Sequence, residues 1–90
     1  MLMVTEDAKE ELQKLLSANV DNPQAGLRLI PSYPDEWTLS IDIEMPGDQV
    51  VEHEGSKVLL VESALAAGLE GATLDVQDTA EGRKLVVYRE

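Results

Sequence analysis

The chain has 90 residues, with 18 Asp and Glu against 7 Lys and Arg, one His and no Cys, and its net charge is −11. This charge repels nucleic-acid phosphates and anionic membrane surfaces, so we expect neither as a partner. Because cysteine is absent, the chain can form no disulfide, thiolate nucleophile or cysteine-ligated cluster.

The length predicts a single domain, residues 1–90, with one modest core. That core is expected to be aliphatic, because the chain contains no Phe and only three aromatic residues, Tyr33, Trp37 and Tyr88. No apolar run reaches the roughly 18 residues that a membrane span needs, and the first residues do not resemble a signal peptide. We therefore expect a cytoplasmic protein.

A helix is predicted over residues 5–18. Thr5 resembles an N-cap, and Glu6 and Asp7 would lie at the positive end of the helix dipole. The apolar face of this helix would comprise Ala8, Leu12, Leu15 and Leu16. Turn-forming residues fill positions 19–26, and a short strand is predicted over residues 27–30.

The next stretch, residues 30–37, is predicted as a loop because Pro31 and Pro34 cannot donate to a sheet. Residues 38–44 alternate as in a half-exposed strand. The expected inner face is Leu39, Ile41 and Ile43, and the expected outer face is Ser40, Asp42 and Glu44.

The second half of the chain predicts two hairpins separated by a short helix. A turn at 46–48 precedes strands at 50–53 and 57–61, which flank a tight turn at 54–56. Ser63 is expected to cap a helix over residues 64–69, and Gly71 follows its end. Strands at 73–77 and 84–89 flank a last turn. Short connections favour antiparallel pairing, so the predicted fold is α+β with a mostly antiparallel sheet.

Acidic residues gather in the middle of the sequence, where no Lys or Arg lies between Arg28 and Lys57. The acids there are Asp35, Glu36, Asp42, Glu44, Asp48, Glu52 and Glu54. If strand 38–44 pairs with strand 50–53, several of them share one sheet face. Such a face is a hard-cation site or a docking surface for a basic protein, or it is only solvated. The absence of a calcium-loop motif favours the solvated face.

The candidate surface residues are Tyr33, Trp37, Asp42, Glu44 and His53. His53, the single imidazole, is a metal ligand or proton carrier, or an exposed turn residue. Tyr33 and Trp37 are anchors for a partner, unless Trp37 instead closes the edge of the core. Arg28 is expected to pair with an acid across the sheet. No catalytic or phosphate-binding motif occurs, so no catalytic residue is assigned and we expect no enzyme.

Four segments jointly resemble a known family: 26–29 (GLRL), 48–52 (DQVVE), 55–61 (GSKVLLV) and 69–75 (LEGATLD). Their order and spacing are similar to those of the HesB-like, or A-type (IscA-like), iron-sulfur cluster biogenesis proteins. The resemblance extends over roughly residues 5 to 88. It implies a compact α+β domain with an N-terminal helix, a second short helix and a pseudo-barrel of strands. It also implies non-enzymatic action and assembly into dimers or higher oligomers, which makes a homodimer one expected state.

The same resemblance implies iron or [2Fe-2S] binding through three cysteines, one after the 26–29 strand and two in a Cys-x-Cys near the C-terminal tail. This chain has no cysteine, so we expect no cofactor. The resulting hypothesis is a cysteine-less HesB-like binding or regulatory module with a basic protein partner. The alternative is a hard-cation or mononuclear iron binder that uses acidic side chains.

Overall fold

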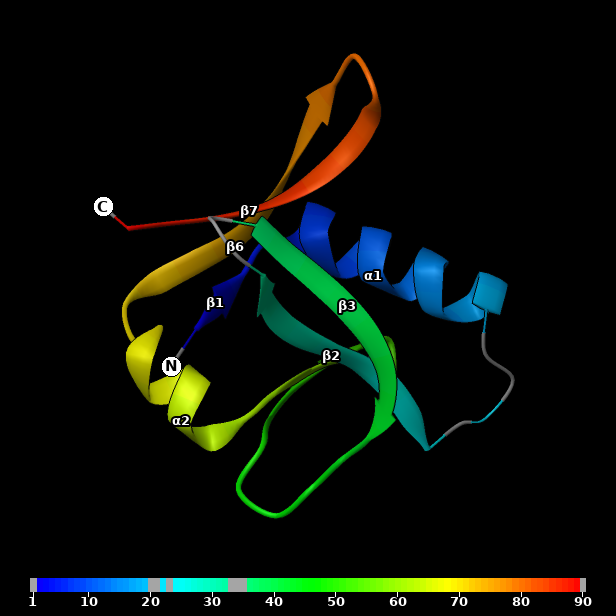
Figure 1. The fold of residues 1–90 in the computed structure, drawn as a ribbon. Coiled ribbons are helices and arrows are strands. Elements are labelled where there is room, and N and C mark those ends of the chain that lie inside the picture. Colours follow the sequence, from blue (N-terminus) through cyan, green and yellow to red (C-terminus); the bar gives the residue numbers. More distant parts are fainter. Residues whose placement is uncertain (1, 20–21, 23, 33–35, 90) are drawn as a thin grey trace.

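The computed structural model, drawn as a ribbon in Figure 1, describes residues 2–19, 22, 24–32 and 36–89. Within these ranges the chain forms two helices and seven strands. In chain order the elements are β1 (Met3–Val4), α1 (Glu6–Asn19), β2 (Ala25–Ser32), β3 (Glu36–Ile43), β4 (Gln49–His53), β5 (Ser56–Val61), α2 (Ser63–Gly68), β6 (Ala72–Thr79) and β7 (Gly82–Arg89). The predicted α+β class is confirmed.

The strands form two sheets, one in the order β1-β6-β7 and the other in the order β3-β2-β5-β4. The three hairpins β2–β3, β4–β5 and β6–β7 are antiparallel, as the short connections predict. Two parallel pairings, β1 with β6 and β2 with β5, complete the mixed sheets. The described strands do not close into a barrel.

The pairing of β3 with β4 that the sequence analysis considered does not form, because these strands lie at opposite edges of the four-stranded sheet. Strand β5 lies inside this sheet, and its residues Val58 to Val61 are fully buried, which is typical of a central strand. Residues 44–48 therefore cross about 14 Å, three strand spacings, to reach β4. The acids of β3 and β4 consequently do not share one cluster.

Helix α1 begins as predicted. The hydroxyl of Thr5 accepts a hydrogen bond of 3.1 Å from the amide of Ala8, which is the geometry of an N-cap. Ala8, Leu12 and Leu16 are buried, but Leu15 is 37% exposed, so its placement in the buried face was wrong. Leu15 lies about 100° around the helix from Leu16, toward the edge of the core.

Strand β1 was not predicted, because two residues are too few to show a period. It pairs in parallel with Thr73 and Leu74 of β6. The amide of Thr5 donates to the carbonyl of Leu74 at 3.1 Å, and its hydroxyl donates to Asp75 at 2.7 Å. The capping residue of α1 thus also holds the N-terminal segment against β6.

The side chain of Gln49 joins the two sheets. Its amide nitrogen donates to the carbonyl of Leu2 at 3.0 Å, and its oxygen accepts from the amide of Leu2 at 3.2 Å. Since Gln49 begins β4 and Leu2 precedes β1, this reciprocal pair connects the edge of one sheet to the edge of the other.

The loop predicted over residues 30–37 is partly strand. Strand β2 continues to Ser32, β3 begins at Glu36, and Pro31 lies opposite Trp37. The proline is tolerated because β5 pairs with β2 only at Leu27 and Arg28, so at Pro31 the strand has a neighbour on the β3 side alone. Tyr33 and Pro34 lie outside the described residues.

The alternation of β3 is correct, but the burial of its inner face was overestimated. Trp37 and Leu39 pack against the core, whereas Ile41 is 51% and Ile43 53% exposed. Helix α1 packs mainly against β4, β5 and β6, so it leaves the far end of β3 uncovered.

The predicted turns are present. The amide of Asp48 donates to the carbonyl of Met45 at 3.1 Å around Gly47, whose φ of +89° favours glycine. The second helix begins one residue earlier than predicted, at Ser63, and ends at Gly68. Glu62 is its N-cap and makes no side-chain capping bond, so the predicted role of Ser63 as a cap was wrong.

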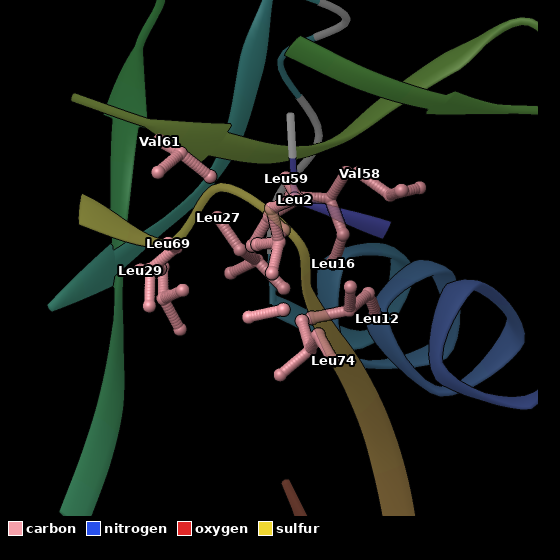
Figure 2. Packing of buried hydrophobic residues seen from close by; sticks show 11 residues of the cluster. Leu2, Leu12, Leu16, Leu27, Leu29, Val58, Leu59, Val61, Leu69 and Leu74 are labelled. Atoms are coloured by element: carbon pink, nitrogen blue, oxygen red, sulfur yellow. The ribbon is translucent and has the colours of Figure 1, made fainter. Parts of the chain in front are cut away.

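The core is aliphatic, as expected, and lies where α1, β2, β5 and β6 meet (Figure 2). Its buried members are Leu2, Leu12, Leu16, Leu27, Leu29, Val58, Leu59, Val61, Leu69, Ala72 and Leu74. Trp37 is partly buried against this cluster, at the point where β3 begins.

Candidate functional site

Arg28 of β2 binds two acids of the middle segment, Asp42 and Asp48. Its Nη1 and Nη2 donate to the two carboxylate oxygens of Asp48 at 3.1 and 2.8 Å, and its Nε donates to Asp42 at 2.7 Å. Nη2 also donates to the carbonyl of Ile43 at 3.2 Å. The predicted pairing of Arg28 with an acid across the sheet is confirmed, and the arginine fixes the 44–48 connection to β2.

Backbone amides complete the coordination of both carboxylates. Asp42 accepts from the amide of Ile43, and Asp48 accepts from the amide of Met45, each at 2.8 Å. The Ile43 amide and then Arg28 lower the pKa of Asp42, while Arg28 and then the Met45 amide lower the pKa of Asp48 against the opposing effect of burial. Both acids are therefore ionised at neutral pH.

The pKa of Arg28 is raised, with its hydrogen bonds to Asp48 and then to Asp42 as the main causes. The side chain of Asp48 is only 2% exposed, and that of Arg28 is 15% exposed. A bidentate pair at this depth is less screened by solvent than the other ion pairs of the surface. It ties the β3–β4 connection to β2.

The other predicted site residues do not converge. Glu44 pairs with Lys57 of β5 at 3.2 Å. His53 lies on β4 at the opposite edge of the sheet, with its Nδ1 3.8 Å from a carboxylate oxygen of Glu6. Its side chain is 13% exposed, so the interpretation as an exposed turn residue was wrong.

The structure gives no geometric support to a hard-cation site. Among residues 2–19, 22, 24–32 and 36–89, no group of three His, Asp or Glu side chains could hold a metal ion. Asp42 and Glu44 are instead paired with Arg28 and Lys57.

Several surface depressions border helix α1, and two of them contain candidate residues or adjoin β3. One, of about 650 Å³, is open to solvent and is lined by Glu10, Gln13, Lys14, Ser17, Ala18, His53 and Glu54. The other, of about 250 Å³, is more apolar, and is lined by Leu15, Asn19, Leu27, Leu39 and Ile41. We call the second one the β3 groove. It lies beside the exposed inner face of β3.

Sequence reasoning missed two parts of this surface. Asp48 was counted only as one of seven acids, although its position just after a Pro-Gly turn could have marked it as a partner for Arg28. The exposure of Ile41 and Ile43 had no sequence signal, because their alternation is the same whether or not a helix covers them.

The fold, with its helix α1, hairpins and short α2, is the HesB-like fold of the A-type iron-sulfur cluster biogenesis proteins. Escherichia coli SufA, described as involved in the biosynthesis of iron-sulfur clusters, matches with a TM-score of 0.74 and 21% identity, over 98% of this chain and 84% of SufA. IscA, solved with a [2Fe-2S] cluster, matches with a TM-score of 0.65 and 20% identity, over 99% of this chain and 85% of IscA.

A protein of Aquifex aeolicus solved in solution matches with a TM-score of 0.66 and 25% identity, over 99% of this chain and 91% of its own. No family model and no curated protein sequence matches the chain. The resemblance inferred from the four sequence segments is therefore confirmed at the level of the fold.

The residues of this chain do not fit a cysteine-ligated cluster. The sequence contains no cysteine, so the soft thiolate donors that such clusters require are missing. The described helices include none that is both long and apolar enough to cross a membrane.

Proposed function

We propose that this chain is a cysteine-less HesB-like module that binds a basic protein in the cytoplasm, acting as a single domain without catalysing a reaction. The observation that carries the proposal is the combination of a fold shared with SufA over 98% of the chain and a sequence without cysteine. The scaffold is kept, while the donors for a cluster are absent.

The charge distribution supports a basic partner. The chain carries −11, and residues 29–56 contain seven acids and no Lys or Arg. A surface of one sign steers oppositely charged proteins and accelerates their association. Arg28 and Asp48 hold part of this segment in one conformation, which lowers the entropy cost of binding.

The first experiment tests for cluster binding. The purified chain is incubated anaerobically with ferrous iron and sulfide and then desalted, with IscA treated in parallel as the control. We expect cluster absorbance with IscA and none with this chain. A stable chain-bound cluster would overturn the proposal that the chain acts without one.

The second experiment tests for a basic partner. The full chain is immobilised and exposed to cytoplasmic extract, and the retained proteins are eluted with a salt gradient and identified. We expect basic proteins that elute as salt rises, because exposed charges are screened over about 8 Å at 0.15 M ionic strength. Retention of only acidic proteins, or of none, would contradict the proposal.

A further inference from the structure

Strand β3 is an open sheet edge of unusual character. It pairs with β2 over eight residues in an unbroken register, and among the described strands none lies on its other side (Figure 1). Its sequence from 36 to 43 contains no Lys, Arg or Pro. An edge strand with these properties is a template for pairing with another chain.

The three other sheet edges among the described strands each carry a feature that hinders such pairing. β1 has only two residues. The pairing of β4 with β5 has a register shift between Val51 and Glu52, and β4 has only five residues. β7 is as long as β3 but carries Arg83, Lys84 and Arg89. Short length, irregularity and charged side chains, above all Lys, are usual protections of an edge. β3 is long and regular, and its charged residues, Glu36 and Asp42, are both acidic.

The inner face of β3 offers apolar contacts to an added strand. Ile41 and Ile43 are about half exposed, and Leu15 of α1, which lines the β3 groove together with Ile41, is 37% exposed. The β3 groove lies between α1 and this face. Alternate side chains of a strand added at the edge would point toward this groove, since successive residues of a strand face opposite sides.

The outer face of β3, continued by residue 44, presents carboxylates to an added strand. Asp42 and Glu44 lie there and form ion pairs with Arg28 and Lys57. Asp48 also pairs with Arg28, so this group of side chains contains three acids and two bases. The other alternate side chains of an added strand would lie on this face. Basic residues fit there, because opposite charges across neighbouring strands are favourable and like charges are not.

We propose that β3 is the docking edge for an extended segment of a basic protein, in which apolar residues facing the β3 groove alternate with basic residues facing Asp42 and Glu44. This inference rests on the proposed function and names the form of its partner. Main-chain hydrogen bonds supply affinity in this mode of recognition, and the alternate side chains supply specificity. A second copy of the chain fits less well, because each copy carries −11.

The test uses two fluorescent nonapeptides of the same composition. In one, five Val alternate with four Lys, and in the other the same residues stand in two blocks. Binding to the whole chain is measured by fluorescence anisotropy, and the protected amides are located by hydrogen exchange. We expect the alternating peptide to bind at least about tenfold more tightly than the block peptide and to protect β3.

Two matched variants locate the site. Ile41→Lys and Tyr88→Lys each place a lysine at an exposed apolar position, one on β3 and the other on β7, which is the edge of the other sheet. Circular dichroism checks that both are folded. We expect Ile41→Lys to weaken peptide binding about tenfold and Tyr88→Lys to change it less than about twofold.

Several results would overturn the docking edge. These are no binding of the alternating peptide, equal binding of both peptides, a larger loss with Tyr88→Lys, or protection of β7 rather than β3. Sedimentation that shows a dimer disrupted by Ile41→Lys would assign β3 to a second copy instead. The cluster and extract experiments decide the proposed function separately, so a basic partner that protects another surface would refute the docking edge alone.

Discussion

Arg28 and Asp48 form two parallel hydrogen bonds, Nη1 to Oδ1 at 3.1 Å and Nη2 to Oδ2 at 2.8 Å, between β2 and the turn that leads away from β3. The pair matters for topology, because the connection it holds must cross from one edge of the four-stranded sheet to the other. The carboxylate is 2% exposed and so depends on its partner for solvation.

Arg28→Met should destabilise the protein by about 2 kcal/mol, because the buried carboxylate of Asp48 loses its cation and keeps only a backbone donor. The measurement is urea unfolding at pH 7. Asp48→Asn is introduced alone and together with Arg28→Met. In the double variant the second substitution should cost less than it does alone, since no buried charge is left unpaired. Strictly additive losses would show that the pair is not coupled.

The stability of the protein should fall in acid. The folded-state pKa values of Asp42, Asp48 and Asp75 are lowered, the last by the Thr5 hydroxyl and the amide of Val76. The contribution of each of these ionised Asp side chains to the free energy of unfolding is complete above the ordinary Asp pKa of about 3.9. It is lost as the pH falls through the lowered folded-state pKa. Urea unfolding between pH 7 and pH 2 should show this decline, and Asp48→Asn should reduce its steepness. A stability that is constant down to pH 2 would refute the assignment.

Thr5→Ala should destabilise the protein by about 1 to 2 kcal/mol, because the hydroxyl both caps α1 and donates to Asp75. Thr5→Ser keeps the hydroxyl and is the matched control, with an expected loss of less than about half of that amount. Thermal unfolding followed by circular dichroism measures both. Equal losses in the two variants would point to the methyl group of Thr5 rather than to its hydroxyl.

Local features of the fold were predictable from the sequence because they depend on neighbouring residues. The hydroxyl of Thr5 before two acids predicted the start of α1, and the turn around Gly47 followed from Pro46 and Gly47. The order β3-β2-β5-β4 was not predicted, because a five-residue connection allows either a hairpin or a crossing. The apolar run Val58 to Val61 was the one signal that β5 is central.

The candidate site was predictable only where it depends on residues that are neighbours in the sequence. The alternation around Arg28 placed its side chain on the face opposite the core, where an acid partner was expected. That the partner is the buried Asp48, and that Ile41 remains half exposed, depends on where the crossing connection and α1 come to lie. These are long-range consequences of packing, which periodicity in one strand does not encode.

Gly26→Ala should destabilise the protein by about 1 to 2 kcal/mol, because a Cβ at this position would lie 3.0 Å from the carbonyl oxygen of Lys57 and 3.2 Å from Cγ of Leu60. The backbone oxygen belongs to β5 and cannot move aside without disturbing the sheet.

Gly68→Ala is the matched control, since nothing lies within 4 Å of its Cβ and α2 is helical there. It should stabilise by about 0.4 to 1 kcal/mol. Urea unfolding of both variants measures the contrast, and a neutral Gly26→Ala would mean that β2 and β5 are less tightly apposed than these distances indicate.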